Sequence, residues 1–77
     1  MTAEELEQIV HREPFQPYRL LLADGEEVIV PRPRKSHVSG DLVALVGECR
    51  RGGGIAVERF RLIPVERVKS VEAFVVP

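Results

Sequence analysis

The chain has 77 residues, a net charge of −1 and 44% hydrophobic residues, which is enough for one small domain with a modest core. A single cysteine, Cys49, excludes an internal disulfide, so we expect a reducing, cytoplasmic compartment. No run approaches the roughly 18 apolar residues of a membrane-spanning helix, and the acidic N-terminus lacks the basic region of a signal peptide.

The charges are unevenly distributed along the chain. Residues 1–30 carry two basic and seven acidic side chains, whereas residues 31–61 carry seven basic and three acidic ones. This asymmetry is compatible with contacts between copies or with a local anion-binding patch. Because so short a domain gains stability from self-association, we expect a homo-oligomer.

A helix is predicted over residues 2–12. Thr2 and Glu5 match a capping box, and Pro14 disfavours helical geometry at the residue before it. Three apolar residues fall on one face of this helix: Leu6, Ile9 and Val10. The helix is therefore expected to lie on a sheet, because so short a helix is marginal alone.

A β-hairpin is the strongest local signal. Two apolar runs, residues 18–23 and 26–30, flank Asp24-Gly25, a pair typical of tight hairpin turns. Both faces of these strands carry apolar residues, which favours cover on both sides by the helix or by another copy. Together with the apolar last strand, this predicts a self-association surface at Leu21, Ile29, Phe74 and Val76.

Three further strands are predicted, over residues 42–46, 55–63 and 68–76. A short strand within 34–38 is an additional alternative. Residues 47–54, which include three consecutive glycines, are predicted to form a flexible loop. A helical turn after Pro64 precedes the last strand. The predicted fold is one domain over residues 1–77, mostly β with one N-terminal α-helix, as a small five-stranded antiparallel partly open barrel.

Two resemblances accompany this fold. The segment from Arg12 to Leu20, with its Pro-Phe-Gln-Pro-Tyr-Arg step, and the following Asp24-Gly25 resemble the opening of small uncharacterised bacterial proteins that begin with an acidic helix. That resemblance implies no activity. The order of elements is similar to that of Sm-like and SH3-like small barrels, but the Asp-x-x-x-Asn pattern that holds RNA bases in Sm-like proteins is absent from residues 26–46.

Basic residues in the middle of the chain form the candidate anion-binding or RNA-binding site. This set consists of Arg32, Arg34, Lys35, His37, Arg50 and Arg51. Arginines on proline-rich and glycine-rich loops contact phosphates by charge and by their planar fork. The alternative is a solvated loop that protects a sheet edge. All four aromatic residues lie in apolar patterns and are predicted to be core: Phe15, Tyr18, Phe60 and Phe74.

No catalytic or metal-binding pattern is present in the sequence. His11, His37 and Cys49 lack metal-ligand spacing, and Cys49 has no neighbouring histidine base. We therefore expect a non-enzymatic protein without a cofactor. The leading hypothesis is an interaction or assembly module that self-associates or meets a protein partner; the alternative is weak binding of RNA or another polyanion.

Overall fold

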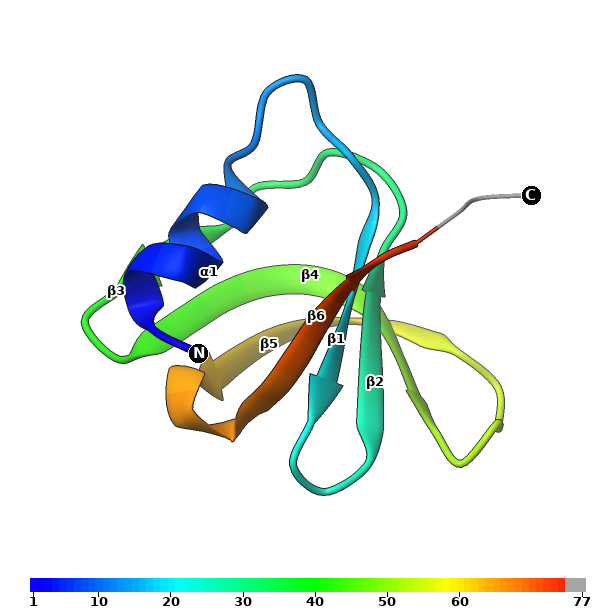
Figure 1. The fold of residues 1–77 in the computed structure, drawn as a ribbon. Coiled ribbons are helices and arrows are strands. Elements are labelled where there is room, and N and C mark those ends of the chain that lie inside the picture. The colour runs from blue at the N-terminus through cyan, green and yellow to red at the C-terminus, as the bar shows by residue number, and fades with distance from the viewer. Residues whose placement is uncertain (75–77) are drawn as a thin grey trace.

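The structure, a computed structural model, describes residues 1–74. In chain order it contains α1 (Ala3–Val10), β1 (Tyr18–Leu22), β2 (Glu26–Val30), β3 (His37–Ser39), β4 (Leu42–Arg51), β5 (Val57–Pro64), the 3₁₀ turn η1 (Val65–Arg67) and β6 (Val68–Ala73). The strands form a curled, open half-barrel, and α1 lies beside β3 at one end of it (Figure 1). The predicted mostly β fold with one N-terminal helix is confirmed.

Strand β4 organises the sheet. Along one side it pairs first with β3 and then with β2, and along the other side it pairs with β5. The sheet continues from β2 to β1 and β6, and β3, β5 and β6 each pair with a single neighbour. All pairs are antiparallel. Figure 1 shows β4 and β5 arching away from β1, β2 and β6, which leaves the barrel open.

The prediction that residues 47–54 form a flexible loop is wrong for its first part. Strand β4 continues to Arg51. Glu48 and Cys49 pair with both β2 and β5, and Arg50 and Arg51 pair with β2. The turn is confined to the glycines that follow, with φ of +61° at Gly52 and +76° at Gly53, a region that favours glycine. The sheet also gains a short strand, β3, so it has six strands and not five.

The core lies between the concave face of the sheet and α1. Alternate residues of β1 are buried, as the strand period requires. Leu6 and Val10 of α1 join the same apolar cluster as Leu20, Val28 and Leu45. The prediction that Phe60 belongs to the core is wrong, because 65% of this residue is exposed.

Local signals define the first helix as predicted. Thr2 is the N-cap, its hydroxyl accepts from the Glu5 amide at 3.2 Å, and the Glu5 carboxylate accepts from the Thr2 amide at 3.2 Å. The helix ends at Val10, slightly before the predicted end. Within residues 1–74, no helix is long and apolar enough to cross a membrane.

Candidate functional site

The convex face of the β4–β5 pair carries a group of exposed and half-buried apolar side chains, which we call the apolar strip. Its members are Leu42, Ala44 and Val46 of β4 with Phe60 and Leu62 of β5. Val46 lies opposite Phe60, and Ala44 lies opposite Leu62, so these pairs share one face. The intervening Val43, Leu45 and Ile63 are buried in the core, which places the strip on the outside.

Strand β5 contributes the most exposed members of the strip. Phe60 is 65% exposed and Leu62 is 61% exposed, whereas Leu42 on β4 is 42% exposed. Large apolar side chains grouped on one face are informative, because isolated ones are ordinary on protein surfaces. The strip is therefore a candidate contact surface.

The inward side of β5 carries Arg61 between Phe60 and Leu62. Nη1 of Arg61 lies 2.7 Å from Oε1 of Glu26 on β2 and 3.6 Å from Sγ of Cys49. The hydrogen bond with Glu26 is the main cause that raises the pKa of Arg61. Successive side chains of a strand point to opposite faces. Because the Arg61 side chain lies on the concave face, those of Phe60 and Leu62 lie on the convex face.

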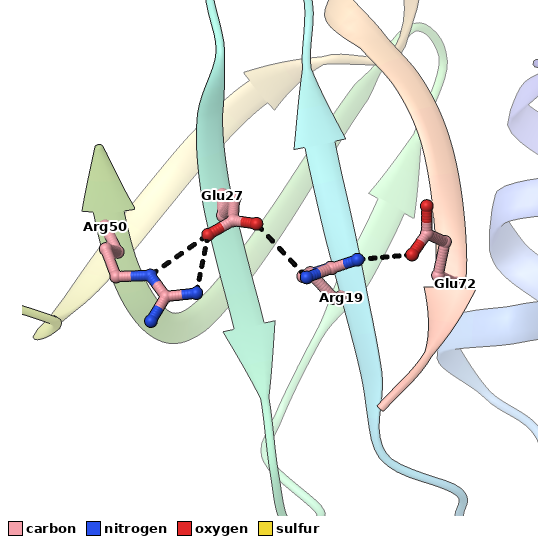
Figure 2. Close-up of polar contacts among 4 residues, drawn as sticks. All are labelled: Arg19, Glu27, Arg50 and Glu72. Carbon is pink, nitrogen blue, oxygen red and sulfur yellow. Dashed lines mark hydrogen bonds and ion pairs between the residues drawn. The ribbon is translucent and has the colours of Figure 1, made fainter. Parts of the chain in front are cut away.

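The other part of the convex face is covered by ion pairs, which we call the charge ladder. Arg50, Glu27, Arg19 and Glu72 follow one another across β4, β2, β1 and β6 (Figure 2). Glu27 accepts from Arg50 at 2.8 Å and from Arg19 at 3.2 Å, and Arg19 also donates to Glu72. The ladder satisfies these charges among themselves, so this region offers little unpaired charge to a ligand.

The four residues predicted for self-association do not form one exposed group. Ile29 is 5% exposed, between Arg19 and Glu48 in the sheet register. Leu21 and Phe74 are half-buried. Val76 lies outside the described residues. Among the described residues, the apolar strip groups exposed apolar side chains on one face, and it contains none of these four.

The structure separates the six residues predicted to bind anions or RNA. Arg50 belongs to the charge ladder, and Arg51 pairs with Asp24 at 2.9 Å. His37 lies on β3 opposite Ala44 of the apolar strip. Only Arg32, Arg34 and Lys35 stay together, on the segment between β2 and β3. Of these, Arg34 pairs with Glu58 at 2.7 Å.

A cleft that the sequence prediction missed lies between this segment and the end of α1. We call it the basic cleft; its volume is about 460 Å³ and it is lined by Val10, His11, Arg12, Glu13, Pro14, Phe15, Pro33, Arg34, Lys35 and Ser36. His11 Nε2 lies 3.1 Å from the carbonyl oxygen of Ser36 and links the two walls. This contact joins residues 25 positions apart, so no local sequence signal indicates it.

The described residues offer no ready metal or thiol chemistry. Within residues 1–74, no three side chains of histidine, cysteine, aspartate or glutamate gather as metal ligands. Cys49 is 7% exposed, and its thiol donates weakly to the carbonyl of Gly47 at 3.8 Å. A thiol so buried is poorly placed for reaction with a dissolved substrate.

Comparisons with protein-family models, curated proteins and solved structures found no match for this chain. The fold and the surfaces described above are therefore the basis for a functional proposal.

Proposed function

We propose that the protein is a non-enzymatic assembly module that self-associates through its apolar strip. The observation that carries this proposal is the exposure of Phe60 and Leu62, 65% and 61%, side by side on the convex face of β5. Burial of apolar surface contributes about 25 cal/mol per Å². Covering two such large side chains in each copy therefore supplies a substantial favourable term.

A second copy of the chain is the occupant that the charges favour. The strip has no ionised side chain of its own, so it offers nothing to recognise a strongly charged partner. The net charge of −1 leaves little repulsion between two copies. A two-fold axis is the commonest symmetry of homo-oligomers. In such a dimer the strip of one copy packs against the same strip of the other copy.

Two copies can associate through the convex faces of their sheets or by pairing their β5 strands edge to edge. The residues of β5 favour the contact between faces. Charged Glu58 and Arg59 stand on this outer strand, and Pro64 at its end has no amide to donate. Charges and prolines are features that discourage pairing at a sheet edge. The proposed contact is therefore made by side chains of the strip, with the edge of β5 at its border.

The test is the mass of the protein in solution as a function of concentration. Sedimentation of the full chain at about 1–100 μM should show reversible association, as expected for a micromolar dissociation constant. The double variant Phe60→Ser with Leu62→Ser should be monomeric over this range with an unchanged circular dichroism spectrum, because both side chains are exposed.

Ile55 supplies the matched control. This residue is 90% exposed but precedes β5 and lies outside the strip. Ile55→Ser should associate as the original chain does. A monomeric original chain at the highest concentration, or equal association of the Phe60/Leu62 double variant, would contradict the proposal.

Polyanion binding is the weaker candidate. Arg34, Arg50 and Arg51 are each engaged by a carboxylate, so a phosphate backbone would have to compete for them. Aromatic side chains that stack on bases in single-strand binders are not interleaved with these arginines.

A further inference from the structure

The basic cleft combines an apolar wall with a cationic rim. Val10, Pro14, Phe15 and Pro33 line one part of it, and Arg12, Arg34 and Lys35 form the cationic rim. His11, Glu13 and Ser36 complete the lining. Its volume of about 460 Å³ lies within the range of small-molecule sites. The cleft lies at the end of α1, whereas the apolar strip lies on β4 and β5, so the two features are independent.

The balance of charge in the cleft favours an anion. The lining holds three basic side chains, Arg12, Arg34 and Lys35, and one carboxylate, that of Glu13. Glu58 offsets Arg34 through its ion pair, with 2.7 Å between Nη2 and Oε1. The carbonyl end of α1 adds a partial negative charge of about half a unit. The remaining excess of charge in the cleft is positive.

Lys35 and Arg12 are the groups best placed to meet a ligand. Among residues 1–74, the Lys35 ammonium makes no ion pair or side-chain hydrogen bond. Arg12 donates through Nη1 to Oε1 of Gln16 at 2.8 Å, a neutral acceptor that leaves its charge uncompensated. Both side chains are exposed at the rim, so neither must break an ion pair to bind a phosphate.

The walls are held in place without a ligand. The ring of Phe15 packs on Tyr18 with 6.2 Å between centroids and 57° between planes. The bond between His11 and the Ser36 carbonyl joins the two sides, and because a carbonyl only accepts, Nε2 is the donor. Prolines on both walls restrict the backbone further. A site formed in advance costs little ordering entropy on binding.

We propose that the basic cleft binds a nucleoside monophosphate, either free or as the 5′-terminal nucleotide of an RNA strand. Arg12 and Lys35 hold the phosphate through charge-assisted hydrogen bonds, and the flat base lies on the apolar wall that includes Phe15. The phosphate supplies the charge that the rim recognises, and the ring supplies the apolar contact that inorganic phosphate lacks.

The test is a titration of the full chain with adenosine 5′-monophosphate, followed by backbone amide NMR shifts. Saturable shifts should gather at residues 10–15 and 33–36, and adenosine or inorganic phosphate alone should bind at least about tenfold more weakly. Lys35→Ala should lower the affinity about tenfold. Lys69→Ala, an equal change of charge on the exposed part of β6, should leave it unchanged.

The two sources of the nucleotide are separated with a short RNA that carries either a 5′-phosphate or a 5′-hydroxyl. Tighter binding of the 5′-phosphorylated strand than of the free nucleotide assigns the site to an RNA end, and equal or weaker binding of that strand assigns it to the free nucleotide. Saturable binding of both RNA strands with the same affinity, equal effects of Lys35→Ala and Lys69→Ala, or no saturable shift with adenosine 5′-monophosphate would overturn the proposal. None of these results bears on self-association through the strip.

Discussion

Glu27 on β2 accepts two hydrogen bonds from Arg50 on β4 through a single carboxylate oxygen, at 3.0 Å from Nε and 2.8 Å from Nη2. Its other oxygen accepts from Arg19 on β1 at 3.2 Å. One carboxylate thus connects three neighbouring strands (Figure 2). Its side chain is 20% exposed, less than either arginine, so Glu27 is the central member of the charge ladder.

Replacing Glu27 by glutamine should lower the free energy of unfolding by about 1 kcal/mol. A single partly exposed ion pair contributes little, but this substitution removes the charge that the pairs with Arg19 and Arg50 share. The measurement is urea unfolding at low and high salt. The loss should shrink in high salt, which screens exposed charges. Glu66→Gln on η1, the same change at an exposed residue, is the control, and an equal loss there would contradict the role of the ladder.

Gly47 on β4 lies close to side-chain and backbone atoms of β2. A Cβ at this position would lie 2.7 Å from Cγ1 of Val28 and 3.1 Å from the carbonyl oxygen of Ile29. Gly47→Ala should therefore destabilise the fold by about 1–3 kcal/mol, the usual cost of overpacking. The check is denaturant unfolding of Gly47→Ala, Val28→Ala and the double variant. Additive losses would show that the two side chains do not collide.

Tyr18 should make the fold sensitive to alkaline pH. Burial raises the pKa of Tyr18 to about 12, whereas an unfolded tyrosine ionises near pH 10. Since the unfolded chain loses this proton first, stability should fall between about pH 10 and pH 12, by roughly 2–3 kcal/mol for the whole interval.

Tyr18→Phe is the matched variant for that measurement. Within residues 1–74 no side-chain hydrogen bond involves the Tyr18 hydroxyl, so Tyr18→Phe breaks none there. The two proteins should therefore unfold at similar urea concentrations at pH 8. At pH 11 the original chain should have lost more stability than Tyr18→Phe. Parallel losses in both would assign the alkaline effect to other groups.

Asp24 stabilises the turn between β1 and β2. Its carboxylate accepts from the Glu26 amide at 3.0 Å, and this bond is the first cause that lowers the pKa of Asp24, followed by the attraction of Arg51 and Arg67. Because the folded pKa is lowered, this contribution is present above the ordinary aspartate pKa of about 3.9 and is lost as the pH falls through the folded value.

Two variants of Asp24 separate the contribution of its hydrogen bond to stability from the contribution of its charge. Asp24→Asn keeps an oxygen for the Glu26 amide and loses the charge, whereas Asp24→Ala loses both, so alanine should destabilise more. Thermal unfolding at pH 7 and pH 2.5 provides the comparison, and the difference between Asp24→Asn and the original chain should largely vanish in acid. A difference that persists in acid would assign the effect to something other than charge.

Local signals in the sequence were sufficient for the first third of the fold. The capping box at Thr2 and the turn at Asp24-Gly25 act over a few residues, and the predicted span 26–30 matches β2. Propensity failed over residues 47–51, where a glycine, a cysteine and charged residues resemble a loop. These residues form a strand because their backbone pairs with β2 and β5. Ion pairs of Arg50 with Glu27 and of Arg51 with Asp24 add to this pairing.

The candidate sites were less predictable because they depend on distant residues. An apolar Phe60 between Arg59 and Arg61 is equally compatible with either face of a strand. The contact of Arg61 with Glu26, 35 positions away, is associated with the outward placement of Phe60. The basic cleft likewise needs the segment at Lys35 to fold back on the end of α1, which only the assembled sheet provides.

Self-association through the apolar strip is tested most directly by contacts between copies. A sample that mixes isotope-labelled and unlabelled full-length chains at a concentration where the dimer predominates should show intermolecular nuclear Overhauser effects from the Phe60 ring to methyl groups of Leu42 or Leu62. A dimer whose intermolecular contacts fall instead on Leu21 or Phe74, or a protein with no such contacts at all, would contradict the account.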